Sequence, residues 1–290
     1  MSALKITQEQ DGAPKREPFD FSTLRFVVHL VTSADGCYYD RESSGSDSDS
    51  DNGYNSEEDM LEEDDDPWLK IYYVKIETTD GTRIDQFGYK VIDKSARRIS
   101  VWMSGGAVTR YYNLAERLHF SERGGSYLEM FGNALWNNNL KKNPKDGNLK
   151  EELVTGDRKG TGVFSTELNK GSFAFISDDP QDAKDDFFIR DEYRGRGIAT
   201  WALKQLFKHN TLKGVRFIFV EPWATRVPQH EDKDAAKEAN EGVQLFFRKN
   251  GFRRVGQSAY FAYALADKNH PSHRLAIEDD AVLSISSYIL

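Results

Sequence analysis

The sequence of this chain predicts an α/β fold. Its second half reads in the order strand, helix, strand, helix, strand, strand. The segment Ile198 to His209 carries apolar residues at the three- and four-residue spacing of an amphipathic helix. The segment Val215 to Val220 is a continuous apolar run, which is typical of a strand buried on both faces. A strand, a helix and a further strand in succession favour a parallel pair joined by a crossover helix.

The first half of the chain predicts strands that pair locally. Leu24 to Thr32 is a short apolar run rich in β-branched residues and reads as a strand. Leu69 to Thr79 alternates, and Asp80-Gly81 then marks a tight turn before a return strand at Arg83 to Asp93. These two strands are expected to form a hairpin. The side chains expected to face inward are Ile71, Tyr73, Val74 and Ile76.

The middle of the chain gives weaker signals. Leu114 to Leu140 is expected to be mostly helical. Asn143 to Lys159 is expected to be a loop, because proline and glycine punctuate a polar stretch. Beyond it, Gly171 to Ser177 and Asp186 to Ile189 read as strands.

The C-terminal part predicts a second helix and a second hairpin. Ala235 to Asn250 reads as the helix, and Gly251 stands where a left-handed cap is usual. Phe252 to Val255 could pair with Tyr260 to Leu265 across a short polar turn.

The formal net charge of −8 comes from one segment. Residues 46–66 carry eleven acids and no lysine or arginine, which leaves 36 acids against 39 bases in the rest of the chain. Like charges repel one another and bury no apolar area, so residues 41–66 are expected to be a disordered insertion. A solvated loop is the simpler interpretation of this segment, although serines among the acids would also suit acid-directed kinases. Those serines are Ser48, Ser50 and Ser56.

Four parts follow along the chain. We expect a disordered tail at 1–20, the N-terminal half of the fold at 21–160 with its insertion, a core at 161–267 and a C-terminal extension at 268–290. Cys37 is the only cysteine, so no intrachain disulfide can form. Neither a membrane-spanning apolar run nor a signal peptide is visible. We therefore expect a soluble protein of the cytoplasm or nucleus without a membrane partner.

The loop Arg194-Gly195-Arg196-Gly197-Ile198-Ala199 has the features of an anion cradle. It follows a short strand and opens a helix, whose first N–H groups and dipole favour negative charge. Its glycines leave the backbone open to a phosphate, and its arginines can grip phosphate oxygens. The glycine spacing fits neither a Walker loop nor a Rossmann fingerprint. Such a turn also closes ordinary strand–helix units, and RGRG could be read as a nucleic-acid patch.

Two motifs resemble the GNAT superfamily of acyl-CoA N-acyltransferases. Arg194-x-x-Gly197-x-Ala199 is similar to its Q/R-x-x-G-x-G/A motif. Asn240 to Phe252 is similar to its N-x-x-A-x-x-L-Y-E-K-x-G-F segment, with Val243 in place of the alanine. The resemblance covers Gly171 to Ala266, and GTGVFSTELNKG just before it resembles a fungal branch of the family, whereas the N-terminal half is divergent.

This resemblance implies a GNAT-like central mixed sheet with flanking helices and with splayed parallel strands, here ending at Ile189 and Val220. It implies acetyl-CoA, or another acyl-CoA, as co-substrate. The pyrophosphate would lie on the backbone amides of Arg196 to Thr200, and the backbone near Ile189 would hold the thioester carbonyl. The residues that the resemblance assigns to the cofactor are Ile189, Arg194, Gly195, Arg196, Gly197, Ile198, Ala199, Thr200, Asn240 and Phe247.

Direct attack by an amine calls for a base, since a lysine-like amine has a pKa of about 10.4 and is mostly protonated at neutral pH. Glu221, directly after the strand at 215–220, is the first candidate catalytic residue, and Glu167 is the second. Asp185 and Asp186 come third. A solvated strand-end carboxylate is an equally good interpretation of Glu221, and a water chain could also serve.

This chain departs from the family at the position of the proton donor for the leaving thiolate. Its frequent tyrosine aligns with Phe247, which has no proton to give. Another tyrosine, water or unassisted departure of the thiolate would have to take its place. His230-Glu231-Asp232 reads as a loop rather than a metal site, so no metal is expected.

The leading hypothesis is therefore an enzyme: an acetyl-CoA-dependent N-acetyltransferase acting on an amine of a small molecule, a peptide or a protein. The alternative is a catalytically weak or inactive GNAT-fold protein that binds CoA or a partner. An RNA-binding protein that uses RGRG is a third hypothesis, and we expect no nucleic-acid partner. Neither the acceptor nor the oligomeric state can be read from the sequence.

Overall fold

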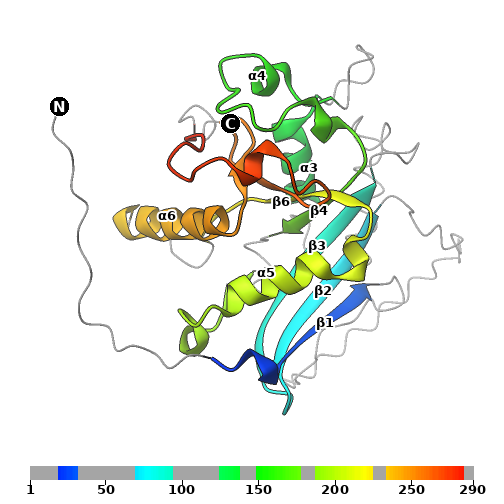
Figure 1. Ribbon diagram of the computed structural model, residues 1–290, viewed down its shortest axis with the longest axis vertical. Helices are drawn as coiled ribbons and strands as arrows, with labels where there is room; N and C mark the ends of the chain where they lie inside the picture. Colours follow the sequence, from blue (N-terminus) through cyan, green and yellow to red (C-terminus); the bar gives the residue numbers. More distant parts are fainter. Residues whose placement is uncertain are drawn as a thin grey trace, which may run out of the picture.

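The chain folds around one mixed sheet with helices on both faces, which confirms the α/β prediction (Figure 1). A computed structural model describes residues 19–31, 69–93, 124–137, 148–177, 187–224 and 233–283. In these residues eight strands form the sheet, in the order β1-β2-β3-β4-β6-β8-β7, with β5 beside β3. The strands are β1 (Leu24–Val31), β2 (Leu69–Thr78), β3 (Arg83–Asp93), β4 (Ser172–Ser177), β5 (Phe188–Ile189), β6 (Val215–Val220), β7 (Arg253–Arg254) and β8 (Phe261–Ala264).

The N-terminal strands pair as antiparallel neighbours. β1 pairs with β2, and β2 pairs with β3 through the predicted hairpin, whose turn places Gly81 at φ 88°. The expected inward set is only partly right. Val74 and Ile76 are fully buried, as expected, whereas Ile71 and Tyr73 are half-buried. β2 lies between two strands and has apolar neighbours on both faces, so strict alternation did not give the correct phase.

The parallel pair consists of β4 and β6, in register from Ser172 opposite Val215 to Ile176 opposite Val220. Helix α5 (Ile198–Lys208) makes the crossover between them. β5 lies further along β3, where Ile189 is opposite Asp85, and among the described strands it has no ladder with β6. The predicted strand at Ile189 therefore exists, but the parallel neighbour of β6 is β4.

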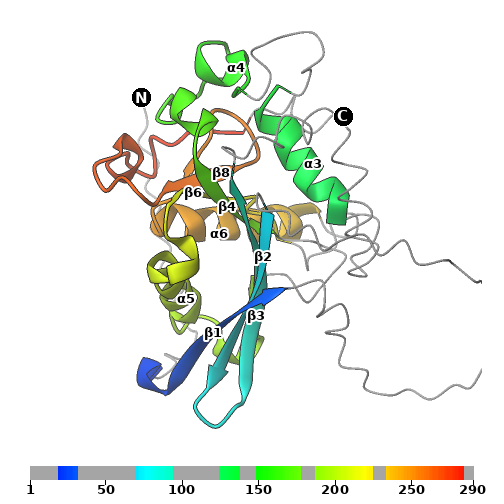
Figure 2. The ribbon, with the colours of Figure 1, turned by 90° about the vertical axis from the view of Figure 1, so that its right-hand side faces the viewer.

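Two apolar clusters lie on opposite faces of the sheet. Helices α5 and α6 (Lys233–Lys249) contribute to one cluster, and α3 (Gly124–Leu135) contributes to the other. Figure 2 shows α3 and α5 on opposite sides of the sheet. Phe131 of α3 is central to its cluster, because its ring stacks on Phe175 with the centroids 4.3 Å apart. Both faces are thus covered, as expected of a sheet with a parallel pair.

One expectation for the middle of the chain needs correction, and a second is tested only in part. The segment expected to be a loop contains a one-turn helix, α4 (Glu151–Val154), which buries Leu153. A single turn is too short to show helical periodicity, so the flanking glycines and prolines dominated the prediction. The predicted helix at 114–140 is confirmed only over α3, and residues 114–123 lie outside the described residues.

The C-terminal helix and hairpin are confirmed. Gly251 follows α6 at φ 90°, and the amide of Val255 donates to the carbonyl of Tyr260 across the turn between β7 and β8. β8 also pairs with β6, where Phe261 is opposite Val220. The C-terminal hairpin is thus part of the same sheet as the parallel pair.

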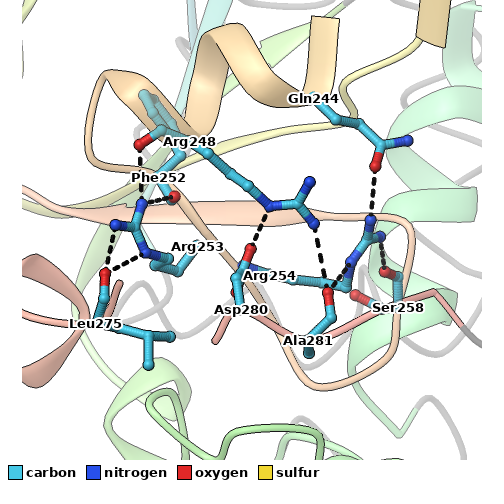
Figure 3. A network of polar contacts seen from close by, with 9 residues as sticks. All are labelled: Gln244, Arg248, Phe252, Arg253, Arg254, Ser258, Leu275, Asp280 and Ala281. Atoms are coloured by element: carbon cyan, nitrogen blue, oxygen red, sulfur yellow. Dashed lines mark hydrogen bonds and ion pairs between the residues drawn. The ribbon is translucent and has the colours of Figure 1, made fainter. Parts of the chain in front are cut away.

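Three arginines attach the C-terminal extension to this hairpin (Figure 3). Arg253 donates to the carbonyl of Leu275, and Arg254 donates to the carbonyl of Ala281. Asp280 accepts from Arg248 Nε at 2.7 Å and from the backbone amide of Arg254 at 3.1 Å. Because Asp280 is 6% exposed, the extension is packed into the fold up to this point.

Two predicted segments lie wholly or mostly outside the described residues: the insertion at 41–66 and the tail at 1–20. The end of that tail is described. Asp20 caps the short helix η1 (Phe21–Thr23), and the Phe19 ring contacts Tyr193. Within the described ranges, no helix has both the length and the apolar character needed to cross a membrane.

Candidate functional site

The glycine-rich loop lies at the carboxyl end of the parallel strands. It follows β5 and the short helix η4 (Asp191–Tyr193) and leads into α5. Gly195 and Gly197 have φ values of 73° and 81°, a region that suits glycine. Gly197 is the N-cap residue of α5, and no side chain caps this helix. The first N–H groups of α5 are therefore available for an anion.

Both glycines are needed for their backbone conformation rather than for packing. A Cβ at Gly195 would meet no atom within 4 Å, and one at Gly197 would meet only the Phe21 ring, at 3.5 Å. Both residues are exposed. The loop therefore presents its backbone to solvent at the start of α5.

The two arginines of the loop have different surroundings. Arg194 donates from Nε to the carbonyl of Ile189 at 2.9 Å, which ties the loop to β5. Arg196 is half-buried, and its Nε is buried without a hydrogen-bond partner among the described residues. A buried charged donor without a partner costs free energy.

The remaining loop residues anchor the helix. Ile198 is 1% exposed and belongs to the cluster under α5, while Ala199 and Thr200 are half-buried in its first turn. Ile189 is 9% exposed, and its carbonyl is occupied by Arg194. Ile189, Ile198 and Ala199 have no polar side-chain atoms, so any polar contact that they make with a phosphate or a thioester would use backbone groups.

An aromatic segment beside the loop was not foreseen. The Phe21 ring is 38% exposed and lies parallel to Trp201 of α5, with the centroids 6.4 Å apart. Phe19 packs edge-on against Tyr193 in the segment that leads into the loop. The sequence carried no signal for this contact, because it joins residues some 180 positions apart in the chain.

Glu221 is half-buried and directly follows β6, one position beyond the pair formed by Val220 and Phe261. It continues the alternation of Phe217 and Phe219, whose side chains belong to the cluster on the α3 face. Burial raises the pKa of the Glu221 carboxyl above its ordinary value, and a hydrogen bond with the Tyr260 hydroxyl opposes that shift. A carboxyl with a raised pKa is the kind of group that general bases use.

Glu167 lies at the other end of the parallel strands, in the short helix η3 (Thr166–Asn169) before β4. Its carboxylate accepts from the amide of Ser165 at 2.7 Å and lies 3.6 Å from Nε2 of His270. The strand β6, about 16 Å long at ~3.3 Å per residue, separates this end from Glu221. The structure therefore does not bring the two candidate carboxylates together.

His270 lies next to a serine and a glutamate, but the burial of His270 and of the serine argues against catalysis. Its Nδ1 lies 2.9 Å from the Ser272 hydroxyl and its Nε2 faces Glu167. Ser272 is fully buried, and its amide is capped by the same imidazole. Burial lowers the pKa of His270, and Glu167 opposes that shift. We interpret the group as a cap that fixes the helix η6 (Pro271–His273).

Two residues of the second motif have structural partners. Asn240 accepts from the backbone amide of Ala224 at 2.6 Å, which fixes the segment that follows Glu221. Phe247 is 3% exposed and packs against Phe187, Phe246 and Phe252 in the cluster under α6. Asn240 thus holds the end of β6 in place, and Phe247 is a core residue.

Other candidates lie elsewhere. Asp185, Asp186 and the triplet 230–232 are outside the described residues. Within the described part of the chain, no three side chains of the kinds that bind metals come together.

Comparison with protein-family models, with curated proteins and with solved structures gave no significant match to this chain. The likeness to acyl-CoA N-acyltransferases therefore rests on the residues of the chain itself.

Proposed function

We propose that this protein is an acetyl-CoA-dependent N-acyltransferase of the GNAT type. The observation that carries the proposal is the loop at Gly195 and Gly197. It opens a helix without a side-chain cap, and it contains Arg196, whose buried Nε has no hydrogen-bond partner among the described residues. This loop and the Glu221 carboxyl lie at the same end of the parallel strands. At this end of the strands, the loop suits the phosphates of an acyl-CoA donor, and the half-buried carboxyl suits a general base.

The sheet pairing supports this arrangement. Val220 of β6 is opposite Ile176 of β4, which in turn is opposite Tyr89 of β3. Ile189 of β5 is instead opposite Asp85 of β3. The two strand ends are therefore four residues apart along β3, or about 13 Å at ~3.3 Å per residue. Because β5 and β6 do not pair, an extended pantetheine arm could reach from the loop toward Glu221.

The two faces of the sheet would have separate roles. The loop and α5 lie on one face, and the Glu221 side chain lies with the cluster of the other. The donor would approach from the α5 face and the amine from the α3 face. Glu221 would take one proton of the ammonium group, and the nitrogen lone pair would then attack the thioester carbon. The carbon–sulfur bond would break with CoA leaving as the thiolate, and the second proton would pass from the nitrogen to water as the amide forms.

One observation favours CoA binding without efficient turnover as a second candidate. Phe247, at the position of the family's proton donor, is buried in the core and offers no proton. The thiolate, whose conjugate thiol has a pKa of about 8.5, would then leave without an acid from this position.

The binding test uses acetyl-CoA, calorimetry and thermal unfolding. At about 100 times its Kd the ligand should stabilise the fold by ~2.7 kcal/mol and raise the Tm by roughly 5 °C. Gly197→Glu should abolish both effects, because it places a carboxylate at the cradle. Gly214→Glu is the matched control, since Gly214 has φ 86° and open space but lies after α5, away from the loop. Wild-type protein that binds no acyl-CoA refutes the proposal.

The turnover test reads thiol release with acetyl-CoA and a panel of amines. Glu221→Gln should lower the rate by about 10²–10⁴-fold, the usual contribution of a general base. Binding without thiol release above the hydrolysis background would select the second candidate.

A further inference from the structure

We propose that Tyr260 is a positioning residue for Glu221: its hydroxyl donates a hydrogen bond that holds the Glu221 carboxylate in one orientation at the end of β6. This inference rests on the proposed function, in which Glu221 acts as the base. Neither sequence motif points to Tyr260. Only the pairing of β6 with β8 brings the two residues together.

The register of the sheet makes the contact specific. Phe261 of β8 is opposite Val220 of β6 in an antiparallel pair, so Tyr260 is opposite Glu221 at the next position. Side chains directly opposite each other in such a pair have Cβ atoms roughly 4.5–5.5 Å apart. This spacing leaves the Tyr260 hydroxyl within hydrogen-bonding reach of the Glu221 carboxyl, whose pKa it lowers.

The ring and the backbone of Tyr260 are fixed by contacts that do not involve Glu221. It is 4% exposed, and its ring centroid lies 5.0 Å from that of Phe131 and 6.3 Å from that of Phe175. Its backbone amide donates to the Ser258 hydroxyl at 3.2 Å, and its carbonyl accepts from Val255. The hydroxyl therefore directs the carboxylate from a fixed position, with little further loss of rotamer freedom.

The hydrogen bond also favours the ionised carboxylate, which is the form that accepts a proton. Burial raises the pKa of Glu221, and the Tyr260 hydroxyl lowers it, with no charged group of the described residues adding to these influences. Loss of the hydroxyl should therefore leave Glu221 protonated over a wider pH range. A residue that served only to fill the core would not have this effect.

The experiment compares Tyr260→Phe with Tyr263→Phe in the full chain. Both remove one hydroxyl near or on β8, but Tyr263 packs against Phe207 and lies outside the Glu221 contact. Acyl transfer is followed against pH by thiol release. In Tyr260→Phe the acidic limb of the rate profile should move to higher pH, whereas Tyr263→Phe should follow the wild type.

A second measurement does not need turnover. The Glu221 carboxyl is titrated by carbon NMR, with its signal assigned by its absence in Glu221→Gln, and its pKa should be higher in Tyr260→Phe. An unchanged rate profile and an unchanged carboxyl pKa in Tyr260→Phe overturn the positioning role while Glu221-dependent transfer stands. Absence of any acyl transfer in the wild type overturns the proposed function, and with it the catalytic role of this pair.

Discussion

The arginine network around the C-terminal extension gives a sharp stability prediction. Asp280→Ala removes the acceptor of Arg248 Nε, 2.7 Å away, and of the Arg254 amide, 3.1 Å away. The Asp280 side chain is fully buried and that of Arg248 is 17% exposed, so water replaces little of what is lost. Removing one partner of a buried ion pair costs about 3–5 kcal/mol. We expect the Tm to fall by roughly 10 °C.

Asp279→Ala is the matched control, because Asp279 is the adjacent residue and is exposed. Surface changes of this kind stay within about 0.5 kcal/mol. The assay is urea unfolding of both variants followed by tryptophan fluorescence and circular dichroism. Equal midpoints for the two variants, or a cost for Asp280→Ala below about 1 kcal/mol, would refute the view that this pair holds the extension in the fold.

Three further predictions test the core around Phe131, the protonation of Glu221 and the backbone at Gly256. Phe131→Ala should cost about 3–5 kcal/mol in urea unfolding because it empties the space against Phe175, whereas Met130→Ala at a 55% exposed neighbour should cost little. The raised pKa of Glu221 favours its protonated form in the folded state, so this carboxyl stabilises the fold below its unfolded pKa and loses that contribution as pH rises through the folded value. Glu221→Gln should therefore be more stable than the wild type at neutral pH, with the difference gone below pH ~4; a gap that widens on acidification would contradict this sign. Gly256→Ala should cost about 2–4 kcal/mol, since its Cβ would lie 2.5 Å from the Arg158 carbonyl oxygen at φ 55°, whereas Gly242→Ala in open space on α6 should raise the unfolding midpoint.

Several helices and strands could be predicted from the sequence because they depend on residues that are close together in the chain. The hairpin at Asp80-Gly81, the strand β6 and the helix α5 have the predicted bounds to within about two residues, since turn chemistry and periodicity act between near neighbours. The glycine loop was predicted for the same reason. Its two positive φ values follow from glycine at those positions.

The residues of the candidate site could be predicted from the sequence, but their arrangement in space could not. The sequence named Glu221 and Glu167 as acids near the sheet, but it could not order them in space. Only the parallel register of β4 and β6 places them at opposite strand ends. Asn240 and Phe247 likewise matched a motif, and packing decided that one holds Ala224 and the other fills the core.

The sequence by itself determined the α/β class, the strand and helix order of the second half and the glycine loop at Arg194 to Ala199, because these depend on residues close together in the chain. The tertiary structure alone decided the contacts between distant segments. It set Tyr260 opposite Glu221, placed Phe21 beside α5 and bonded Asp280 to Arg248. These contacts depend on strand register and on packing across the sheet, which no local pattern of residues specifies.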